Sequence, residues 1–122
     1  MTALLSLSQQ LTLRSALASL GQTPDAVATA LARAGATGRR GEYEDSPVGA
    51  YLNGLLTAAG LRPLRWTVGD TEAVGRFPGP PRPGDYPPAT VLLPLPTAVQ
   101  AFQHQFDLGG YPALDARRVG RR

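Results

Sequence analysis

His104 is the only histidine of the chain and its most obvious catalytic candidate. A single histidine could serve as a general base. However, no serine stands in a Gly-x-Ser-x-Gly elbow, and no motif identifies an acid that would orient the imidazole. Gln103 and Gln105 flank His104, which projects roughly opposite Phe102 on an expected helix, so we expect an exposed histidine. A small hydrolase or metal-dependent enzyme around His104 is therefore the least favoured of three functional hypotheses.

A second candidate for chemistry is the acidic group Glu42, Glu44 and Asp45, whose oxygens could bind a hard cation. The group lacks the spaced acidic positions and the closing glutamate of a calcium loop. Because it directly precedes an expected helix start, its charges more simply favour the helix dipole or stay solvated. The chain has no cysteine, which excludes disulfides and thiolate metal sites. We predict no catalytic residue, no metal and no cofactor.

All twelve basic residues are arginine, and four of them lie in the last six positions: Arg117, Arg118, Arg121 and Arg122. Residues 1–116 carry eight arginines against nine carboxylates, so the body has a net charge of −1 and the tail supplies the positive excess. We expect a disordered tail that could contact phosphates without sequence preference. Arg39 and Arg40, between Gly38 and Gly41, could add to such contacts. Weak nucleic-acid binding is the second hypothesis.

The first half of the chain predicts three helices. The first begins at about residue 8 and ends at Gly21, with apolar residues at the spacing of one helical face: Leu13, Ala16, Leu17 and Leu20. Ser6 with Gln9 fits a capping box for its start, whereas the alternation of leucine with polar residues over 5–13 would also fit a strand. In the second and third helices, Thr23-Pro24 and Ser46-Pro47 pair a capping residue with a proline suited to the first helical position. The third helix, residues 47–59, contains no charged residue, which disfavours DNA readout. We interpret it as core or as a partner interface.

The second half predicts a small sheet and a last helix. Residues 64–68 alternate as a half-buried strand does, a weaker strand covers 72–77, and 90–93 form a short apolar strand. The segment 78–88 has six prolines in eleven residues and predicts a polyproline-like or disordered loop. The last helix begins at Leu95-Pro96, or with Thr97 and Gln100 as a capping box.

The apolar face of this last helix is well marked. Leu95, Val99, Phe102 and Phe106 follow one another at spacings of four, three and four residues. We expect these side chains in the core. The polar side chains that point elsewhere should face water: Gln100, Gln103 and Asp107.

Two stretches carry a resemblance to known sequences. Residues 34–38 running into 46–52, and residues 95–107 ending in 110–114, resemble a family of small uncharacterised proteins of GC-rich actinobacterial genomes. The pattern spans most of residues 20–114. The resemblance implies an accessory protein and not an enzyme of known activity. The family often has cysteine where this chain has Ser46, so a thiol-based role is not expected here.

Taken together, the sequence predicts one α+β domain over residues 1–116, followed by a basic, disordered tail at 117–122. The domain has three N-terminal helices, a small two- or three-stranded sheet and a C-terminal helix. No apolar run approaches a membrane span and no signal peptide is recognisable, so we expect a cytoplasmic protein. The favoured function is a non-catalytic accessory protein that binds a protein partner. The residues expected to contact it lie on the third helix and the proline-rich loop: Tyr51, Leu55, Arg82 and Tyr86.

Overall fold

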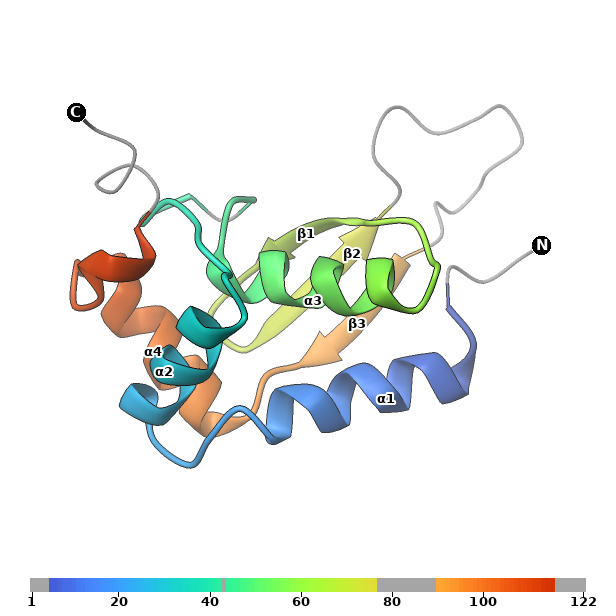
Figure 1. The fold of residues 1–122 in the computed structure, drawn as a ribbon, viewed down its shortest axis with the longest axis horizontal. Coiled ribbons are helices and arrows are strands. Elements are labelled where there is room, and N and C mark those ends of the chain that lie inside the picture. Colours follow the sequence, from blue (N-terminus) through green and yellow to red (C-terminus); the bar gives the residue numbers. More distant parts are fainter. Residues whose placement is uncertain (1–4, 43, 77–89, 116–122) are drawn as a thin grey trace.

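The computed structural model describes residues 5–42, 44–76 and 90–115 (Figure 1). Its elements, in chain order, are α1 (Leu7–Ala18), α2 (Pro24–Arg33), α3 (Pro47–Ala58), β1 (Arg65–Val68), β2 (Glu72–Arg76), β3 (Thr90–Pro94), α4 (Thr97–Asp107) and the 3₁₀ helix η1 (Pro112–Leu114). The strands form one antiparallel sheet in the order β1-β2-β3. The predicted α+β class is confirmed, with three strands.

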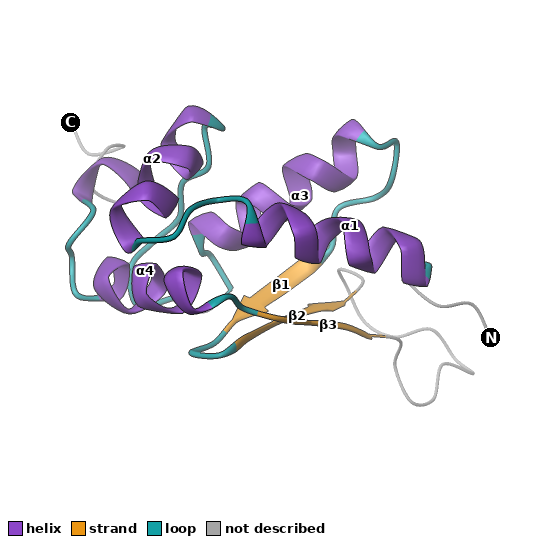
Figure 2. Cartoon of the chain, turned by 90° about the horizontal axis from the view of Figure 1, so that it is seen from below, coloured by secondary structure: helices purple, strands orange, loops and turns teal. Residues whose placement is uncertain are grey.

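The helices divide between one face of the sheet and one of its ends. Figures 1 and 2 show α1 and α3 lying across the same face, with α1 packed against β3 and α3 against β1. Helices α2 and α4 pack against each other beside the end of the sheet. The opposite face of the sheet carries no helix of the described part of the chain.

Helix starts follow the capping chemistry read from the sequence. The Ser6 side chain accepts from the Gln9 amide while the Gln9 side chain accepts from the Ser6 amide, so α1 begins with a capping box at Leu7. Thr23 caps α2 by accepting from the Ala26 amide. The alternative capping box of the last helix is wrong, because Thr97 is the first residue of α4 and Pro96 occupies the N-cap position without a side-chain hydrogen bond.

The tightest fit between helix and sheet involves Trp66. In the antiparallel register Trp66 faces Gly75 of β2, and its indole lies across that glycine. A Cβ at position 75 would come within 2.8–3.0 Å of three ring carbons, and a Cβ at Gly49 of α3 within 3.1 Å of the Trp66 Cβ. Glycine at both positions leaves room for the buried Trp66 side chain between strand and helix.

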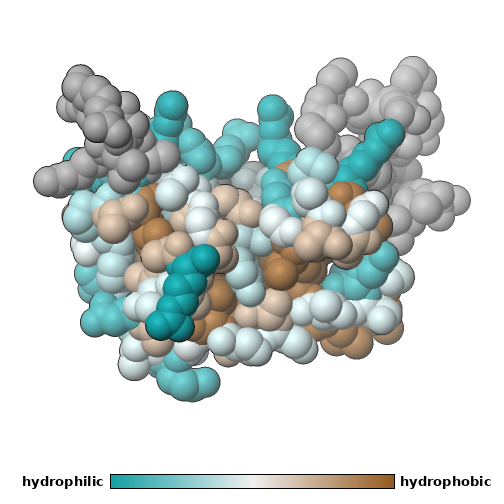
Figure 3. Space-filling model, in the orientation of Figure 1, coloured by the Kyte–Doolittle hydropathy of each residue, from teal (hydrophilic) through white to brown (hydrophobic). Residues whose placement is uncertain are grey.

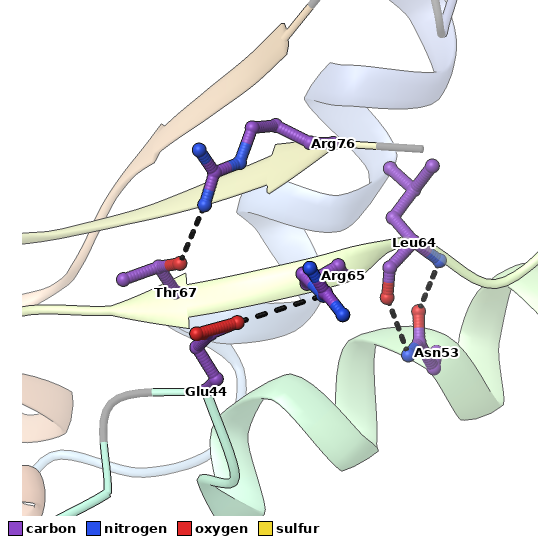
Figure 4. A network of polar contacts seen from close by, with 6 residues as sticks. All are labelled: Glu44, Asn53, Leu64, Arg65, Thr67 and Arg76. Atoms are coloured by element: carbon purple, nitrogen blue, oxygen red, sulfur yellow. Dashed lines mark hydrogen bonds and ion pairs between the residues drawn. The ribbon is translucent and has the colours of Figure 1, made fainter. Parts of the chain in front are cut away.

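Asn53 of α3 fixes the helix at the correct height along β1. Its Oδ1 accepts from the Leu64 amide at 2.8 Å and from the Trp66 Nε1 at 2.9 Å, and its Nδ2 donates to the Leu64 carbonyl at 2.8 Å. Figure 4 shows the two Asn53–Leu64 bonds. This residue is the only asparagine of the chain, and its side chain satisfies both backbone groups of the residue before the strand.

The predicted face is buried: Val99, Phe102 and Phe106 of α4 lie in the core, as does Leu95, two residues before the helix begins. His104 is exposed, as predicted. The expectation that Gln103 faces water is wrong, since Gln103 is 3% exposed. Its Oε1 accepts from the Ser46 hydroxyl at 2.7 Å, and its Nε2 lies 3.3 Å from both carboxylate oxygens of Asp107. Because Ser46 at the start of α3 donates a hydrogen bond to it, the buried amide oxygen of Gln103 is not left unsatisfied.

Ser46 therefore has two structural roles. Its hydroxyl oxygen accepts a hydrogen bond from the Val48 amide at 3.1 Å, as the N-cap prediction required. The same hydroxyl donates a hydrogen bond to Gln103 Oε1. We expect Ser46→Ala to lower the unfolding free energy by about 2–3 kcal/mol. About 1 kcal/mol of this comes from the lost cap, and the remainder from a buried amide oxygen left without a donor.

The matched control is Ser6→Ala, because Ser6 caps α1 with an exposed hydroxyl and has no buried partner. It should cost about 1 kcal/mol. Chemical unfolding of both variants measures the difference. Equal losses would show that the Ser46–Gln103 bond adds nothing to the cap.

Candidate protein-binding surface

Helix α1 exposes leucine side chains on its outer surface in addition to those that it buries against the core. Leu13 and Leu17 are buried, whereas Leu7 and Leu11 are 72% and 50% exposed. These two leucines are four residues apart, so they lie one above the other on the solvent side of the helix. Over its twelve residues α1 has one charged side chain, Arg14.

Helix α3 lies beside α1 on the sheet and carries no charged side chain. None of its twelve residues is ionisable except Tyr51. The residues that it exposes are small or hydroxylated: Ala50, Gly54, Thr57 and Ala58. Tyr51 and Leu55, both predicted partner contacts, are half-buried and pack against the core, so part of each side chain remains accessible.

We call the outward side of these two helices the α1–α3 surface, defined by Leu7, Leu11, Tyr51, Gly54 and Leu55. Figure 3 shows this side of the molecule: tan and brown side chains gather over α1 and α3, while the most hydrophilic colours lie along the upper edge and over α2. Charged residues are depleted at the centres of protein interfaces, and contiguous exposed apolar surface marks interaction sites.

Sequence reasoning missed Leu7 and Leu11. The available signal was that leucine recurs on more than one side of the first helix, which exceeds what a single buried face needs. Arg82 and Tyr86, the other two predicted partner contacts, lie outside the described residues.

The arginines of the nucleic-acid hypothesis are only partly described. Arg39 Nε lies 3.5 Å from Asp45 Oδ2, and Arg40 Nε lies 3.7 Å from Asp115 Oδ2. More than half of each arginine side chain is exposed, whereas the Asp115 side chain is only 8% exposed. Carboxylates of the same chain thus compensate both guanidinium groups. Arg117, Arg118, Arg121 and Arg122 lie outside the described residues.

The loop that carries these arginines is held against the C-terminal end of α4. The Gly38 amide donates to the Leu114 carbonyl at 3.0 Å, and Gly38 pairs with Asp115 as a parallel bridge. The Gly41 amide donates to Asp107 Oδ1, also at 3.0 Å. Together with the Ser46–Gln103 bond, these contacts join residues 38–46 to residues 103–115.

Among the described residues, neither His104 nor the acidic group before α3 lies in an arrangement typical of catalysis or metal binding. His104 takes part in none of the side-chain hydrogen bonds or ion pairs found among the described residues. Within residues 5–42, 44–76 and 90–115, no group of three or more histidine, cysteine, aspartate or glutamate side chains could hold a metal ion. No helix in that part of the chain has the length and apolarity to cross a membrane.

Comparisons with models of protein families, with curated proteins and with solved structures each gave no match.

Tyr111 connects three elements next to this loop. Its ring stacks on Phe102 of α4 with centroids 5.1 Å apart, and its hydroxyl donates to Asp25 Oδ1 of α2 at 2.7 Å. Burial is the largest of three causes that together raise the pKa of Tyr111 to about 12; the others are the hydrogen bond to Asp25 and the charge of that carboxylate.

This shift predicts a loss of stability in alkali. A tyrosine whose pKa is higher in the folded state than its ordinary 10.0 contributes fully below pH 10. The contribution falls between pH 10 and about 12, where the unfolded chain has already lost the proton. At about 1.4 kcal/mol per pKa unit, reduced for partial exposure, we expect a loss of about 1–2 kcal/mol.

Urea unfolding across this pH window tests the prediction. Tyr111→Phe should flatten the alkaline decline. Tyr51→Phe is the matched control, because the Tyr51 hydroxyl makes no hydrogen bond within the described part of the chain. A decline of the same steepness in Tyr111→Phe and in the wild type would assign it to other groups.

Proposed function

We propose that this protein is a non-catalytic binding protein that docks a protein partner on the α1–α3 surface. The observation that carries the proposal is the exposure of Leu7 and Leu11 on a two-helix layer with a single charged side chain, Arg14. Covering these leucines removes apolar area from water, which is favourable by roughly 25 cal/mol per Å² before the costs of association.

The chemistry of this surface favours a protein over other macromolecules. A nucleic acid would require cations at its phosphates, and the surface offers only Arg14. Helices that lie on anionic membranes usually carry several lysines or arginines on their polar face, which neither α1 nor α3 does. The expected partner contributes an apolar helix or sheet face. Tyr51 supplies an aromatic side chain of the kind enriched at interfaces.

A second candidate function, weak nucleic-acid binding, is favoured by one observation. Asp115 pairs with Gly38, so the residue two positions before Arg117 lies beside the loop that bears Arg39 and Arg40. We rank it second because Asp45 and Asp115 already compensate those two arginines.

The experiment is quantitative affinity capture from extracts of the native host. We expect Leu7→Ser/Leu11→Ser to reduce recovery of the principal protein partner by about tenfold or more, as the loss of interface anchors does. Both substituted side chains are exposed, so the thermal melt should be unchanged.

Leu108→Ser is the matched control, since Leu108 is 68% exposed but lies at the C-cap of α4, away from the α1–α3 surface. It should retain the partner, and His104→Ala should retain it as well. Retention by the double leucine variant would refute the α1–α3 surface as the binding site. Loss upon nuclease treatment would favour the nucleic-acid alternative.

A further inference from the structure

The face of the sheet opposite α1 and α3 has its own chemical pattern. The register places outward side chains in rows across the three strands. One row is Arg65, Arg76 and Thr90, and the next is Thr67, Val74 and Leu92. Figure 2 shows that no described helix covers this face.

The first row puts two positive charges side by side. Arg65 and Arg76 are directly paired across β1 and β2, and both are exposed. Like charges in opposed positions destabilise a sheet unless something compensates them. Arg65 has a partner, because its Nε lies 3.5 Å from Glu44 Oε1.

Arg76 differs from Arg65 in this respect. Its Nη2 lies 3.3 Å from the Thr67 hydroxyl, and it forms no ion pair with a described carboxylate (Figure 4). An anion placed at this row would gain charge-assisted hydrogen bonds from a guanidinium that no described carboxylate compensates.

Two of the three residues in the second row, Val74 and Leu92, are apolar. Leu92 is 55% exposed and lies beside the half-buried Val74. Along the strands this row is two residues from the arginine row, which corresponds to about 7 Å. An extended peptide repeats the same spacing between side chains at positions i and i+2. Glu72, opposite Pro94, lies at the other end of the face. Its carboxylate disfavours a second carboxylate there, so an acidic ligand should bind at the arginine end.

We propose that this open face binds an extended acidic segment of a protein. A glutamate or aspartate of the segment contacts Arg76 and Arg65, and an aliphatic side chain two positions along covers Leu92 and Val74. Single-stranded nucleic acid fits less well, because its bases stack on aromatic side chains and these two rows contain none. Trp66, on the same strand, points to the buried side.

The test uses a labelled synthetic peptide in which glutamate and leucine alternate with serine, so that glutamate and leucine are two positions apart. Binding to the full chain is followed by fluorescence anisotropy over a range of salt concentrations. We expect Arg76→Gln to weaken binding about tenfold, the effect of losing one hydrogen bond to a charged group. Leu92→Ser should weaken binding of this peptide but leave that of polyglutamate unchanged.

Arg33→Gln is the matched control, because it removes one exposed arginine from the last turn of α2 and leaves the open face intact. Equal losses for Arg76→Gln and Arg33→Gln would mean that only net charge matters, which overturns the proposal. So would an absence of peptide binding, or tighter binding of a single-stranded oligonucleotide than of the peptide. The Leu7→Ser/Leu11→Ser variant should bind the peptide normally, so the outcome is independent of the α1–α3 surface.

Discussion

The position of α3 depends on the way Trp66 fits between two glycines. The indole lies against Gly75 of the neighbouring strand, and Gly49 of α3 lies against the Trp66 Cβ. Asn53 then binds the indole nitrogen and both backbone groups of Leu64, which fixes the helix along the strand as well as above it. A side chain at either glycine would force the helix, the strand or the indole to move, because interiors packed to this density have no spare volume.

The packing on the inner side of α3 explains why its outer side is left exposed. One side of α3 is committed to Trp66 and to the core residues Val48, Leu52 and Leu56, and Ser46 attaches the start of the helix to Gln103 of α4. On the other side no described residue lies close to Gly54, since a Cβ there would have no atom within 4 Å. A helix held this firmly and yet free of charge outside is a rigid platform, and rigidity before binding lowers the entropic cost of association. The two faces proposed for binding, one helical and apolar and one of strands with arginines, lie on opposite sides of the sheet.

Much of the local structure could be predicted from the sequence, because caps and periodicity act over a few residues. Ser46-Pro47, Thr23-Pro24 and the Phe102/Phe106 face are such signals, and the structure confirms each. Gln103 could not be placed in this way, since its burial depends on a hydroxyl 57 residues away in the chain. The pairing of Arg65 with Arg76 likewise depends on the strand register, which no single strand specifies. Leucine on more than one side of the first helix indicated that some of these leucines are exposed, but which ones depends on where the neighbouring elements lie.

The central claim is that the inner side of α3 packs closely around Trp66, whereas no described atom lies close to Gly54 on its outer side. Two glycine-to-alanine variants test the two parts of this claim. Gly75→Ala should destabilise the protein by about 1–3 kcal/mol, since the new methyl group meets the Trp66 ring. Gly54→Ala should stabilise it by about 0.5–1 kcal/mol, since alanine replaces glycine in an exposed helix without meeting an atom. Opposite signs in chemical unfolding are the result that the account predicts. A neutral Gly75→Ala combined with a destabilising Gly54→Ala would contradict it, because the outer side of α3 would then be the packed one.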